Sequence, residues 1–487
     1  MSVRCLVTGA TGYIGGRLAP RLLAEGHQVR CLARKAGRLR DVPWAAQAEI
    51  VEGDLRRPET LPAAFADVDV AYYLVHSLGQ AGFEAADREA ATNFARAAAA
   101  AGVRRIVYLG GPEPAAGGTA SPHLRSRAEV ARILLAGEVP TVVLRAAVII
   151  GSGSASFEML RYLTERLPAM ITPRWVRNRI QPIAVRDVLR YLVGCADLPP
   201  EVDRAFDIAG PDVLTFREMM QRYAQVAGLR RRIIVPVRPL TPALSSHWVG
   251  LITPVPNAIA RPLVESLIHE AVAHEHDIAR WLPDPPGGLT GFDDAVALAL
   301  SKVRDAQVET RWSNASGPDA PAEPLPSDPD WSGGTAYTDV REQEVAAPPA
   351  ALWRVIEGVG GEHGWYSFPL AWSVRGWLDR LVGGVGLRRG RRDPHHLQVG
   401  EALDFWRVEE IVPGELLRLR AEMRLPGRAW LELRAEPAGD GHSRYVQRAV
   451  FLPRGLPGHL YWLSVAPFHT IIFGGMARNI ARHTPTP

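Results

Sequence analysis

Cysteine is scarce in this chain, which has only three among its 487 residues: Cys5, Cys31 and Cys195. Their positions match no metal-binding or disulfide spacing, so the sequence predicts neither a zinc site nor a disulfide framework. We expect buried, unreactive thiols in a reducing, cytoplasmic environment. The N-terminal residues lead directly into a strand-like run, and we therefore expect no signal peptide.

An excess of charge is also absent. The 56 Lys and Arg residues nearly balance the 52 Asp and Glu residues, which leaves a net charge of only +4 for a mass of 53.2 kDa. The sequence has no basic stripe interleaved with aromatic residues, so it predicts no nucleic-acid partner. The composition, 47% hydrophobic and 22% charged, is that of a globular protein long enough for two or three domains.

Long hydrophobic runs are missing except over residues 456–477. This run contains His459, His469, two prolines and a glycine pair. These residues favour a buried helix or a contact at the membrane interface over a membrane span. The sequence therefore leaves open a peripheral contact with the inner face of the membrane.

A metal-binding pattern is incomplete in the run LIHEAVAHEHDIARW, residues 267–281. His269 and Glu270 could begin a His-Glu-x-x-His pair, but Ala273 occupies the place of the second histidine. In a helix, His269 and His274 would lie about 140° apart around the axis and could not share a metal ion. We expect a solvated helix here and no metal.

The first 150 residues alternate between strand-like and helix-like segments. Strand patterns cover residues 4–10, 28–34, 48–54, 69–75, 104–110 and 140–150, and helical patterns include Arg17–Glu25 and Arg88–Ala101. Continuous apolar strands that alternate with helices are typical of a parallel sheet covered on both faces. The sequence therefore predicts an α/β, doubly wound Rossmann domain.

Composition divides the chain further. We expect residues 1–312 to hold the Rossmann domain and a substrate-side extension, about 151–312. Residues 313–334 are rich in Pro, Ser, Asp and Gly, which is typical of a linker. Residues 335–487 contain a helix near Ala350–Gly358, extended segments around 400–410, 415–424, 428–436 and 443–452, and a final apolar helix. This order predicts an α+β domain.

The run VTGATGYIGGRL places Gly9, Gly12 and Gly15 between the first predicted strand and the first predicted helix. Gly9 allows a tight turn, Gly12 lets the backbone approach a pyrophosphate, and Gly15 lets the helix pack closely on the strand. The N-terminus of such a helix offers N–H groups and a positive dipole end to phosphates. The sequence therefore predicts a dinucleotide-binding site.

The end of the second strand indicates which dinucleotide binds. Proteins that bind NAD usually have an acidic residue there, whereas this chain has Arg34 and Lys35, with Arg38 behind them. Such cations suit a 2′-phosphate, so we predict NADP(H) as the preferred cofactor and keep NAD(H) as an alternative. A solvated basic turn is the other interpretation. Asp54, after the third strand, could meet the adenine amino group.

Seven motifs follow one another over roughly residues 1–230: VTGATGYIGGRL, GDL, VDVAYYLVHS, REAATNFARAAAAAGVRRIVYLGG, VVLRAAVIIGSGS, IQPIAVRDV and FDIAGPDVLTFREMM. In kind and order they resemble the extended or atypical short-chain dehydrogenase/reductases, above all the NmrA-like and YbjT-like NAD(P)-binding proteins. The resemblance implies that Val75 and His76 border the nicotinamide ribose, that Arg145–Val148 faces the carboxamide, and that residues 181–188 line a substrate cleft. The implied cofactor contacts are Thr8, Gly9, Thr11, Gly12, Tyr13, Ile14, Gly15, Arg34, Lys35, Asp54, Leu55, Val75, His76, Arg127, Ala146, Ala147 and Val148.

Two departures from this family concern catalysis. Its active members have a Ser or Thr at the end of the fifth strand, where this chain has Gly110 and Gly111. They also have a Tyr-x-x-x-Lys pair for proton transfer, where this chain has His123 and Arg127. Arg127 can supply positive charge but cannot titrate usefully, and its charge should lower the pKa of His123. His123 and Arg127 are the catalytic candidates, with ribose contact or packing as the other interpretation of His123.

Residues 335–487 resemble, in the order of their elements, the helix-grip domains of the START-like and polyketide-cyclase superfamily. The resemblance implies an antiparallel sheet folded over a long C-terminal helix around an apolar cavity. Seven tryptophans could line it or belong to an ordinary core: Trp353, Trp365, Trp372, Trp377, Trp406, Trp430 and Trp462. An arginine cluster, residues 388–392, could contact an anion or lipid headgroups or be a solvated loop.

Three functions are compatible with these patterns. The first is NADP(H)-dependent oxidoreduction of a small apolar, quinone- or enone-like substrate, with the hydride chemistry done by the cofactor. The second is NADP(H) sensing by a non-catalytic regulatory protein, and the third is carriage of an apolar ligand or lipid by the C-terminal domain. The residues at positions 110, 111 and 123 disfavour ordinary carbonyl reduction. The sequence leaves the oligomeric state open.

Overall fold

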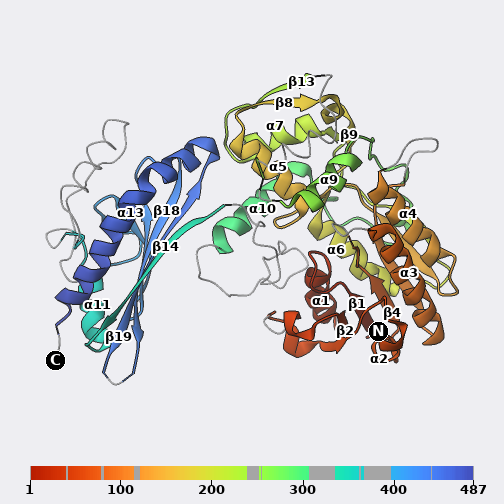
Figure 1. Ribbon diagram of the computed structural model, residues 1–487, viewed down its shortest axis with the longest axis horizontal. Coiled ribbons are helices and arrows are strands. Elements are labelled where there is room, and N and C mark those ends of the chain that lie inside the picture. Colours follow the sequence, from red (N-terminus) through yellow and green to blue (C-terminus); the bar gives the residue numbers. More distant parts are fainter. Residues whose placement is uncertain are drawn as a thin grey trace. The chain divides into compact units, whose positions relative to one another are not determined.

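The computed structural model describes residues 2–39, 42–77, 82–113, 121–237, 252–253, 255–306, 335–360, 364–366, 396–439 and 441–485. The chain divides into two compact units, formed mainly by residues 1–306 and 335–487 (Figure 1). Each unit has a hydrophobic core of its own. The predicted linker, residues 313–334, lies outside the described residues.

A seven-stranded parallel sheet forms the centre of the first unit. In spatial order its strands are β11 (Arg204–Asp207), β6 (Thr141–Arg145), β5 (Arg105–Gly110), β4 (Val70–Tyr73), β1 (Arg4–Thr8), β2 (Gln28–Ala33) and β3 (Glu49–Glu52). The order reverses between β1 and β4, the position at which doubly wound sheets bind ligands beyond the carboxyl ends of their strands. The α/β Rossmann class predicted from the sequence is confirmed.

Helices cover both faces of this sheet because its strands are apolar on both sides. α1 (Gly15–Ala24) and α6 (Val185–Gly194) pack on the face that contains Cys5 and Val7. α2 (Pro62–Phe65), α3 (Phe83–Ala100) and α4 (Pro122–Leu135) pack on the face that contains Leu6. Figure 1 shows α3 and α4 side by side, and the two helices are in contact.

The three cysteines are buried, and burial is the main cause that raises the pKa of each thiol to about 12. They are therefore protonated at neutral pH and unreactive, as the sequence predicts.

The extension after β6 has a smaller core of its own, shared by α5 (Ala155–Arg166), α7 (Phe216–Val226) and α10 (Phe292–Ala306), with α9 (Asn257–Ser266) beside α5. Its strands pair as β7 (Ile149–Ile150) with β10 (Ile183–Ala184), β9 (Arg179–Ile180) with β12 (Leu214–Thr215), and β8 (Ala169–Pro173) with β13 (Ile233–Val237). Short 3-10 turns span Ala36–Leu39, Ala45–Gln47, Pro58–Thr60, Arg174–Arg177, Cys195–Asp197 and Asp277–Arg280.

Two local predictions for this unit are wrong. The run 140–150 is not one strand, because the chain leaves the central sheet after Arg145 and pairs again at Ile149 with the extension. The run 267–281 is not a helix: α9 ends at Ser266, and the Ala271 N–H then donates to the Arg179 carbonyl at 2.9 Å. A single bridge between Ala271 and Ile180 of β9 lies in this run, and Asp277–Arg280 form a short 3-10 turn. No group of ligands suited to a metal ion occurs among the described residues.

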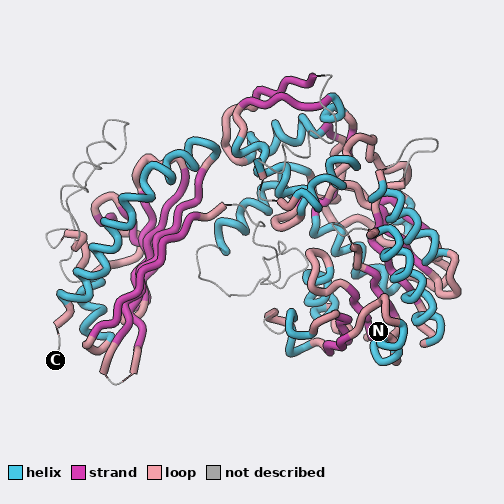
Figure 2. The backbone as a smooth tube through the Cα atoms, in the orientation of Figure 1, coloured by secondary structure: helices cyan, strands magenta, loops and turns pink. Residues whose placement is uncertain are grey.

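Within the described residues of the second unit, two helices pack on an antiparallel sheet. Its order is β14 (Tyr337–Val345), β19 (Ser443–Pro453), β18 (Gly427–Pro437), β17 (Leu416–Ala421), β16 (Trp406–Val412) and β15 (Ala402–Leu403). α11 (Pro349–Glu357) and α13 (Gly455–His483) contribute Leu352, Ile356, Phe473 and Met476 to one core with the sheet. Figure 2 shows α13 running along the sheet. The α+β class predicted for this region is confirmed.

The long helix α13 is bent by 44° between its arms Gly455–His469 and Ile471–His483. Pro467 lies just before the bend, and a proline inside a helix removes one backbone hydrogen bond and clashes with the preceding turn. Among the described residues no single helix is long and apolar enough to cross a membrane, and only the two arms of α13 taken together pass on length and composition.

Candidate cofactor site and active site

The glycine loop between β1 and α1 is too closely packed for side chains. Gly9 has φ +72°, and a Cβ atom there would lie 2.6 Å from the carbonyl oxygen of Leu74, just after β4. A Cβ atom on Gly15 would lie 2.3 Å from the carbonyl oxygen of Gly9. The Gly12 N–H donates to the Gly9 carbonyl at 2.9 Å, and Gly12 is exposed. The loop is thus a tight turn whose backbone is open to a ligand.

The N-terminus of α1 is suited to an anion. Ile14, the residue before the helix, provides no side-chain cap, and the first turn holds no acidic residue. Instead the turn holds Arg17, which is 4% exposed and donates from Nη1 to the Tyr13 carbonyl at 3.0 Å. A cation at the positive end of a helix dipole is unfavourable by itself, and a bound pyrophosphate would offset that cost. The loop and the buried Arg17 therefore fit a dinucleotide. The sequence predicted the loop but not the role of Arg17.

Three cations and a fixed turn lie beside the glycine loop, at the ends of β2 and β3. Arg34, Lys35 and Arg38 are all exposed. The Asp54 carboxylate accepts the Arg56 N–H at 3.0 Å, which holds the turn after β3. Leu55 is buried, and its carbonyl accepts a hydrogen bond from the Asn93 side chain. The arrangement is compatible with recognition of an adenosine 2′-phosphate by the cations.

Not every predicted contact faces a ligand. Thr8 is 1% exposed, and its hydroxyl donates to the Tyr72 carbonyl at 2.8 Å while accepting the Leu74 N–H at 3.2 Å. Thr8 therefore joins the ends of β1 and β4 and has a structural role. Thr11, Tyr13 and Ile14 are half-buried in the loop, and Val75 is half-buried after β4.

His76, His123 and Arg127 come together at the carboxyl edge of the sheet. His76 follows β4, and His123 and Arg127 lie one turn apart on α4. Arg127 donates from Nη1 to the carbonyl of Leu109, at the end of β5, at 3.0 Å. Burial first, then the Arg127 charge and the His76 ring, lower the pKa of His123 to about 3. The predicted effect of Arg127 on His123 is confirmed.

His76 responds to the same surroundings. Desolvation by neighbouring protein atoms, followed by the Arg127 charge, lowers the pKa of His76, although its side chain keeps contact with solvent. At neutral pH the cluster therefore holds two neutral imidazoles and one fixed positive charge.

One buried carboxylate positions this cluster. Asp87 on α3 is 7% exposed, and its oxygens accept the Ser77 N–H at 2.8 Å and the Ser126 hydroxyl at 3.0 Å. Ser77 is next to His76 in the chain, and Ser126 is next to Arg127. The sequence analysis missed Asp87 because the helix predicted there begins at Arg88, one residue too late. An acidic residue on the apolar face of a longer helix would have been the signal.

The end of β5 has no hydroxyl that could replace those of the family. A Cβ atom on Gly110 would lie 3.0 Å from the Tyr108 ring, so this position has little room for a side chain. Tyr108 is buried and donates its hydroxyl to the Arg127 carbonyl at 3.3 Å, and burial raises its pKa. Tyr108 therefore does not act in place of the missing tyrosine.

The segment after β6 is held next to β5. The Ala146 N–H donates to the Gly110 carbonyl at 3.2 Å; Ala146 and Val148 are buried and Ala147 is half-buried. Arg145 pairs with Asp207 at 2.7 Å and with Glu113. In the predicted cleft segment 181–188, the Gln181 side chain donates to the Gly210 carbonyl and accepts the Ala273 N–H. Gln181 therefore ties the extension together.

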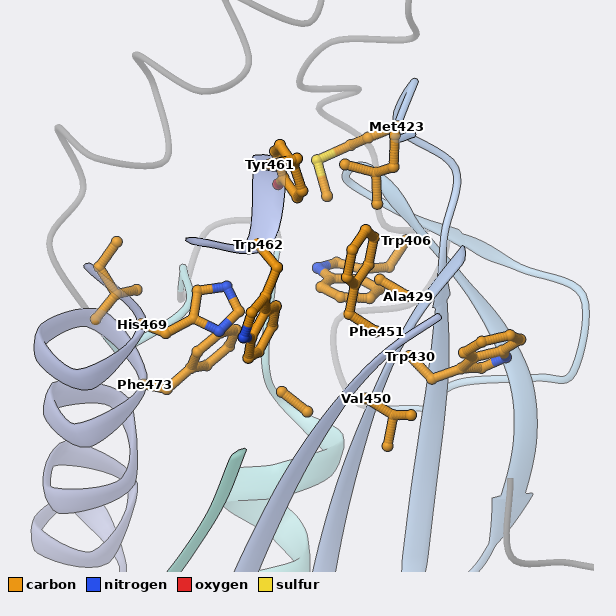
Figure 3. Close-up of a pocket in the computed structure, with 13 residues that line it drawn as sticks. Trp406, Met423, Ala429, Trp430, Val450, Phe451, Tyr461, Trp462, His469 and Phe473 are labelled. Carbon is orange, nitrogen blue, oxygen red and sulfur yellow. The ribbon is translucent and has the colours of Figure 1, made fainter. Parts of the chain in front are cut away.

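A separate cavity of about 70 Å³ lies inside the second unit, between α13 and the sheet (Figure 3). Except for His469, its lining is apolar or aromatic, and it includes Tyr461, Phe451 and Phe473. Of the seven tryptophans, Trp406, Trp430 and Trp462 line the cavity, Trp353 and Trp365 belong to the core, and Trp372 and Trp377 lie outside the described residues, as does the arginine cluster 388–392.

Comparison with known families gives each unit a counterpart. A family model described as NAD(P)H-binding matches residues 9–136, from the glycine loop to the end of α4. The first unit is an NAD(P)H-binding Rossmann domain. This result confirms the cofactor class predicted from the sequence. A second model, described as a protein of unknown function (DUF2867), matches residues 331–476. It does not address the resemblance of this unit to START-like domains, which stays an expectation.

Individual relatives agree with the Rossmann assignment. The chain is 27% identical over 299 residues to the ceramide reductase of Caulobacter vibrioides, which is 60% of this chain and 92% of that protein. It is 25% identical over 236 residues to the photosystem II assembly factor Ycf39 of Trieres chinensis, 47% of this chain and 70% of that protein. An uncharacterised protein of Mycobacterium tuberculosis is 28% identical over 236 residues, 48% of this chain, but the chain spans only 24% of its length.

Among solved structures, the triphenylmethane reductase of Citrobacter sp. has the same fold, with a TM-score of 0.50 and 21% identity over 62% of this chain and all of that chain. A nucleoside-diphosphate-sugar epimerase of Staphylococcus aureus also matches with a TM-score of 0.50, at 15% identity over 61% of this chain and all of that one. At such identities the likeness concerns the fold.

We predict that Gly15→Ala lowers the affinity for NADPH by about tenfold or more, because the new Cβ atom would force α1 away from the loop at Gly9. Gly26→Ala is the matched control: Gly26 has φ +83° at the other end of α1 with no atom within 4 Å of its Cβ position. We expect it to cost about 1 kcal/mol of stability without affecting NADPH binding. Fluorescence titration and urea unfolding measure both effects. An unchanged affinity of a folded Gly15→Ala variant would contradict the role of the loop.

The double variant Arg34→Ala/Lys35→Ala should bind NADPH about 10 to 100 times more weakly, because two charged hydrogen-bond donors to a 2′-phosphate are lost. NADH affinity should change by less than about threefold, since NADH lacks that phosphate. Arg96→Ala, an exposed arginine on α3, is the control. Calorimetric titration with both cofactors decides the matter, and an equal loss for NADPH and NADH would count against 2′-phosphate recognition.

The depressed pKa of His123 predicts a loss of stability in acid. Unfolded, the imidazole has a pKa near 6.5, whereas in the folded protein it stays neutral down to about pH 3. Between about pH 7 and pH 5 the unfolded state therefore gains a proton that the folded state does not. The free energy of unfolding falls by about 2 kcal/mol over this range. Urea unfolding at the two pH values should show a smaller loss for His123→Gln. The control His442→Gln, at an exposed position, should lose as much stability between the two pH values as the wild type. If His123→Gln also loses as much as the wild type, the lowered pKa of His123 is disproved.

Proposed function

We propose that this protein is an NADP(H)-dependent reductase of an apolar substrate with a conjugated acceptor, such as an enone or a quinone. The observation that carries the proposal is the cluster His76, His123 and Arg127 at the same sheet edge as the glycine loop. This cluster offers a fixed positive charge and no side chain that holds a readily released proton at neutral pH. Such a site suits an acceptor that becomes an anion first and is protonated later.

The residues of the site have separable roles in this proposal. The loop Gly9–Gly15 and the N-terminus of α1 bind the pyrophosphate, and Arg34 and Lys35 bind the 2′-phosphate. When bound, the reduced nicotinamide supplies a hydride to the acceptor. Arg127 stabilises the negative charge that develops on the acceptor oxygen, and a proton from solvent completes the reduction. His123 orients the acceptor by hydrogen bonding as a neutral imidazole.

The relatives support the chemical class. A protein named ceramide reductase is similar over 92% of its length, which favours a reductase and a lipid-like substrate. The apolar cavity of the second unit supports a second candidate function, binding and carriage of an apolar ligand, in line with the START-like resemblance. We place the reductase first because cofactor binding is established for the first unit.

The test measures NADPH oxidation with a panel of quinones, enones, aldehydes and long-chain ketones. We expect turnover with conjugated acceptors. Arg127→Gln should lower kcat by about a hundredfold, because the positive charge is lost, and Arg127→Lys should restore part of it. His123→Gln should lower kcat by less than about tenfold.

The opposite ranking, with His123→Gln the more damaging variant and a pH limb near its pKa, would make His123 the proton donor instead. NADPH binding without oxidation of the cofactor by any acceptor of the panel would replace the reductase with an NADP(H)-sensing protein.

A further inference from the structure

We propose that the outer face of α13 docks on the surface of an anionic lipid bilayer. The inference concerns the second unit alone and does not depend on the reductase activity. The face consists of five large apolar side chains, which we call the outer stripe: Leu456, Leu460, Leu463, Phe468 and Ile471, exposed by 37%, 57%, 65%, 61% and 57%.

The outer stripe follows one side of the helix. At 100° per residue, Leu456, Leu460 and Leu463 fall within about 60° of one another on the first arm, with Phe468 at the flank. Ile471 is the first residue of the second arm. The Ser464 hydroxyl on this side donates to the Tyr461 carbonyl at 2.7 Å, so it is already paired within the helix. Exposed leucines that are scattered singly are ordinary, but a continuous apolar side of a helix marks a contact surface.

The opposite side of the same helix is already used. Trp462 stacks between Tyr337, with ring centres 4.9 Å apart, and Phe451, at 5.9 Å. Tyr461 and Trp462 line the cavity, whereas Leu460 and Leu463, directly before and after them, face solvent. The packing of the core therefore does not account for the outer stripe.

The positive charge around the outer stripe favours an anionic surface as the partner. α13 has no acidic residue over its 29 positions, and its last turn contains Arg482 and His483. At its start, the Arg454 N–H donates to the Pro426 carbonyl at 2.9 Å, which brings the hairpin residues Arg424 and Arg428 close to the helix. All three arginines are exposed. An apolar strip next to a group of arginines is complementary to a bilayer with anionic headgroups.

The bend of α13 is compatible with lying on a surface. The two arms together are apolar enough for a membrane, but neither arm alone is long enough to cross one, and they meet at 44°. The inner side of both arms is packed in the core through Trp462, Phe473, Met476 and Ile480. A helix that stays packed on its own sheet can offer only its outer side to lipid, which places it in the headgroup region.

Co-sedimentation of the full chain, without NADPH, tests the proposal with two kinds of vesicle: phosphatidylcholine alone, and phosphatidylcholine mixed with phosphatidylglycerol. We expect binding to the mixed vesicles that weakens at high salt. The variant L460S/L463S/F468S/I471S should bind at least about tenfold more weakly, because the apolar contact is lost. The variant R424S/R428S/R454S should lose about fivefold per arginine on the anionic vesicles.

The matched control is V340S/V399S/V412S, which removes exposed apolar side chains of the same unit that do not belong to α13, exposed by 48%, 62% and 37%. It should bind vesicles like the wild type. NADPH affinity and thermal unfolding verify that each variant is folded. No binding to either vesicle, or equal binding by wild type and the stripe variant, would overturn the proposal. So would a dimer seen by light scattering that the stripe variant alone converts to a monomer, because the face would then belong to a second copy of the chain.

Discussion

The approach of three backbone segments to one another at the carboxyl edge of the sheet determines the shape of the first unit. The loop after β1 touches the chain after β4 at Gly9, and α1 touches that loop at Gly15, at distances that exclude any side chain. This contact sets where α1 begins and leaves its first N–H groups without a side-chain cap. It also places the end of β4, and with it His76, next to the glycine loop and the N-terminus of α1. The cofactor site and the position of the candidate active site therefore depend on the same two glycines.

Around this edge the chain has a fixed charge, Arg127, where active members of the family that it resembles have the lysine of a titrating pair. The arginine at the place of the usual lysine keeps its proton, and together with burial it keeps His123 neutral. Asp87 holds the neighbours of His76 and Arg127, since it accepts hydrogen bonds from Ser77 and Ser126. The result is an electrostatically defined site that does not depend on proton uptake near neutral pH. The site therefore differs in its proton chemistry, and not only in its residue types, from a site for ordinary carbonyl reduction.

The second unit shows how one helix can have two roles. The aromatic inner side of α13 closes the core and the cavity, and its apolar outer side faces solvent. One face of the antiparallel sheet packs on the core and the other faces solvent, so residues along a strand alternate between the two, as in β14, where every second residue is exposed. α13 differs from the strands because its solvent-facing side is also apolar.

The sequence by itself determined the Rossmann and α+β classes, the glycine loop and the contribution of Arg127 to the lowered pKa of His123, because all of these follow from local periodicity or from residues one turn apart. The larger contribution to that pKa, burial, comes from the tertiary structure. Tertiary structure alone decided the rest. It divided the run 140–150 between two sheets, ended α9 at Ser266 and bridged Ala271 to β9, and buried Thr8. It also linked the neighbours of His76 and Arg127 through Asp87, and placed three of the five described tryptophans of the second unit at the cavity. These outcomes depend on contacts between residues far apart in the chain, and local patterns carry no information about such contacts.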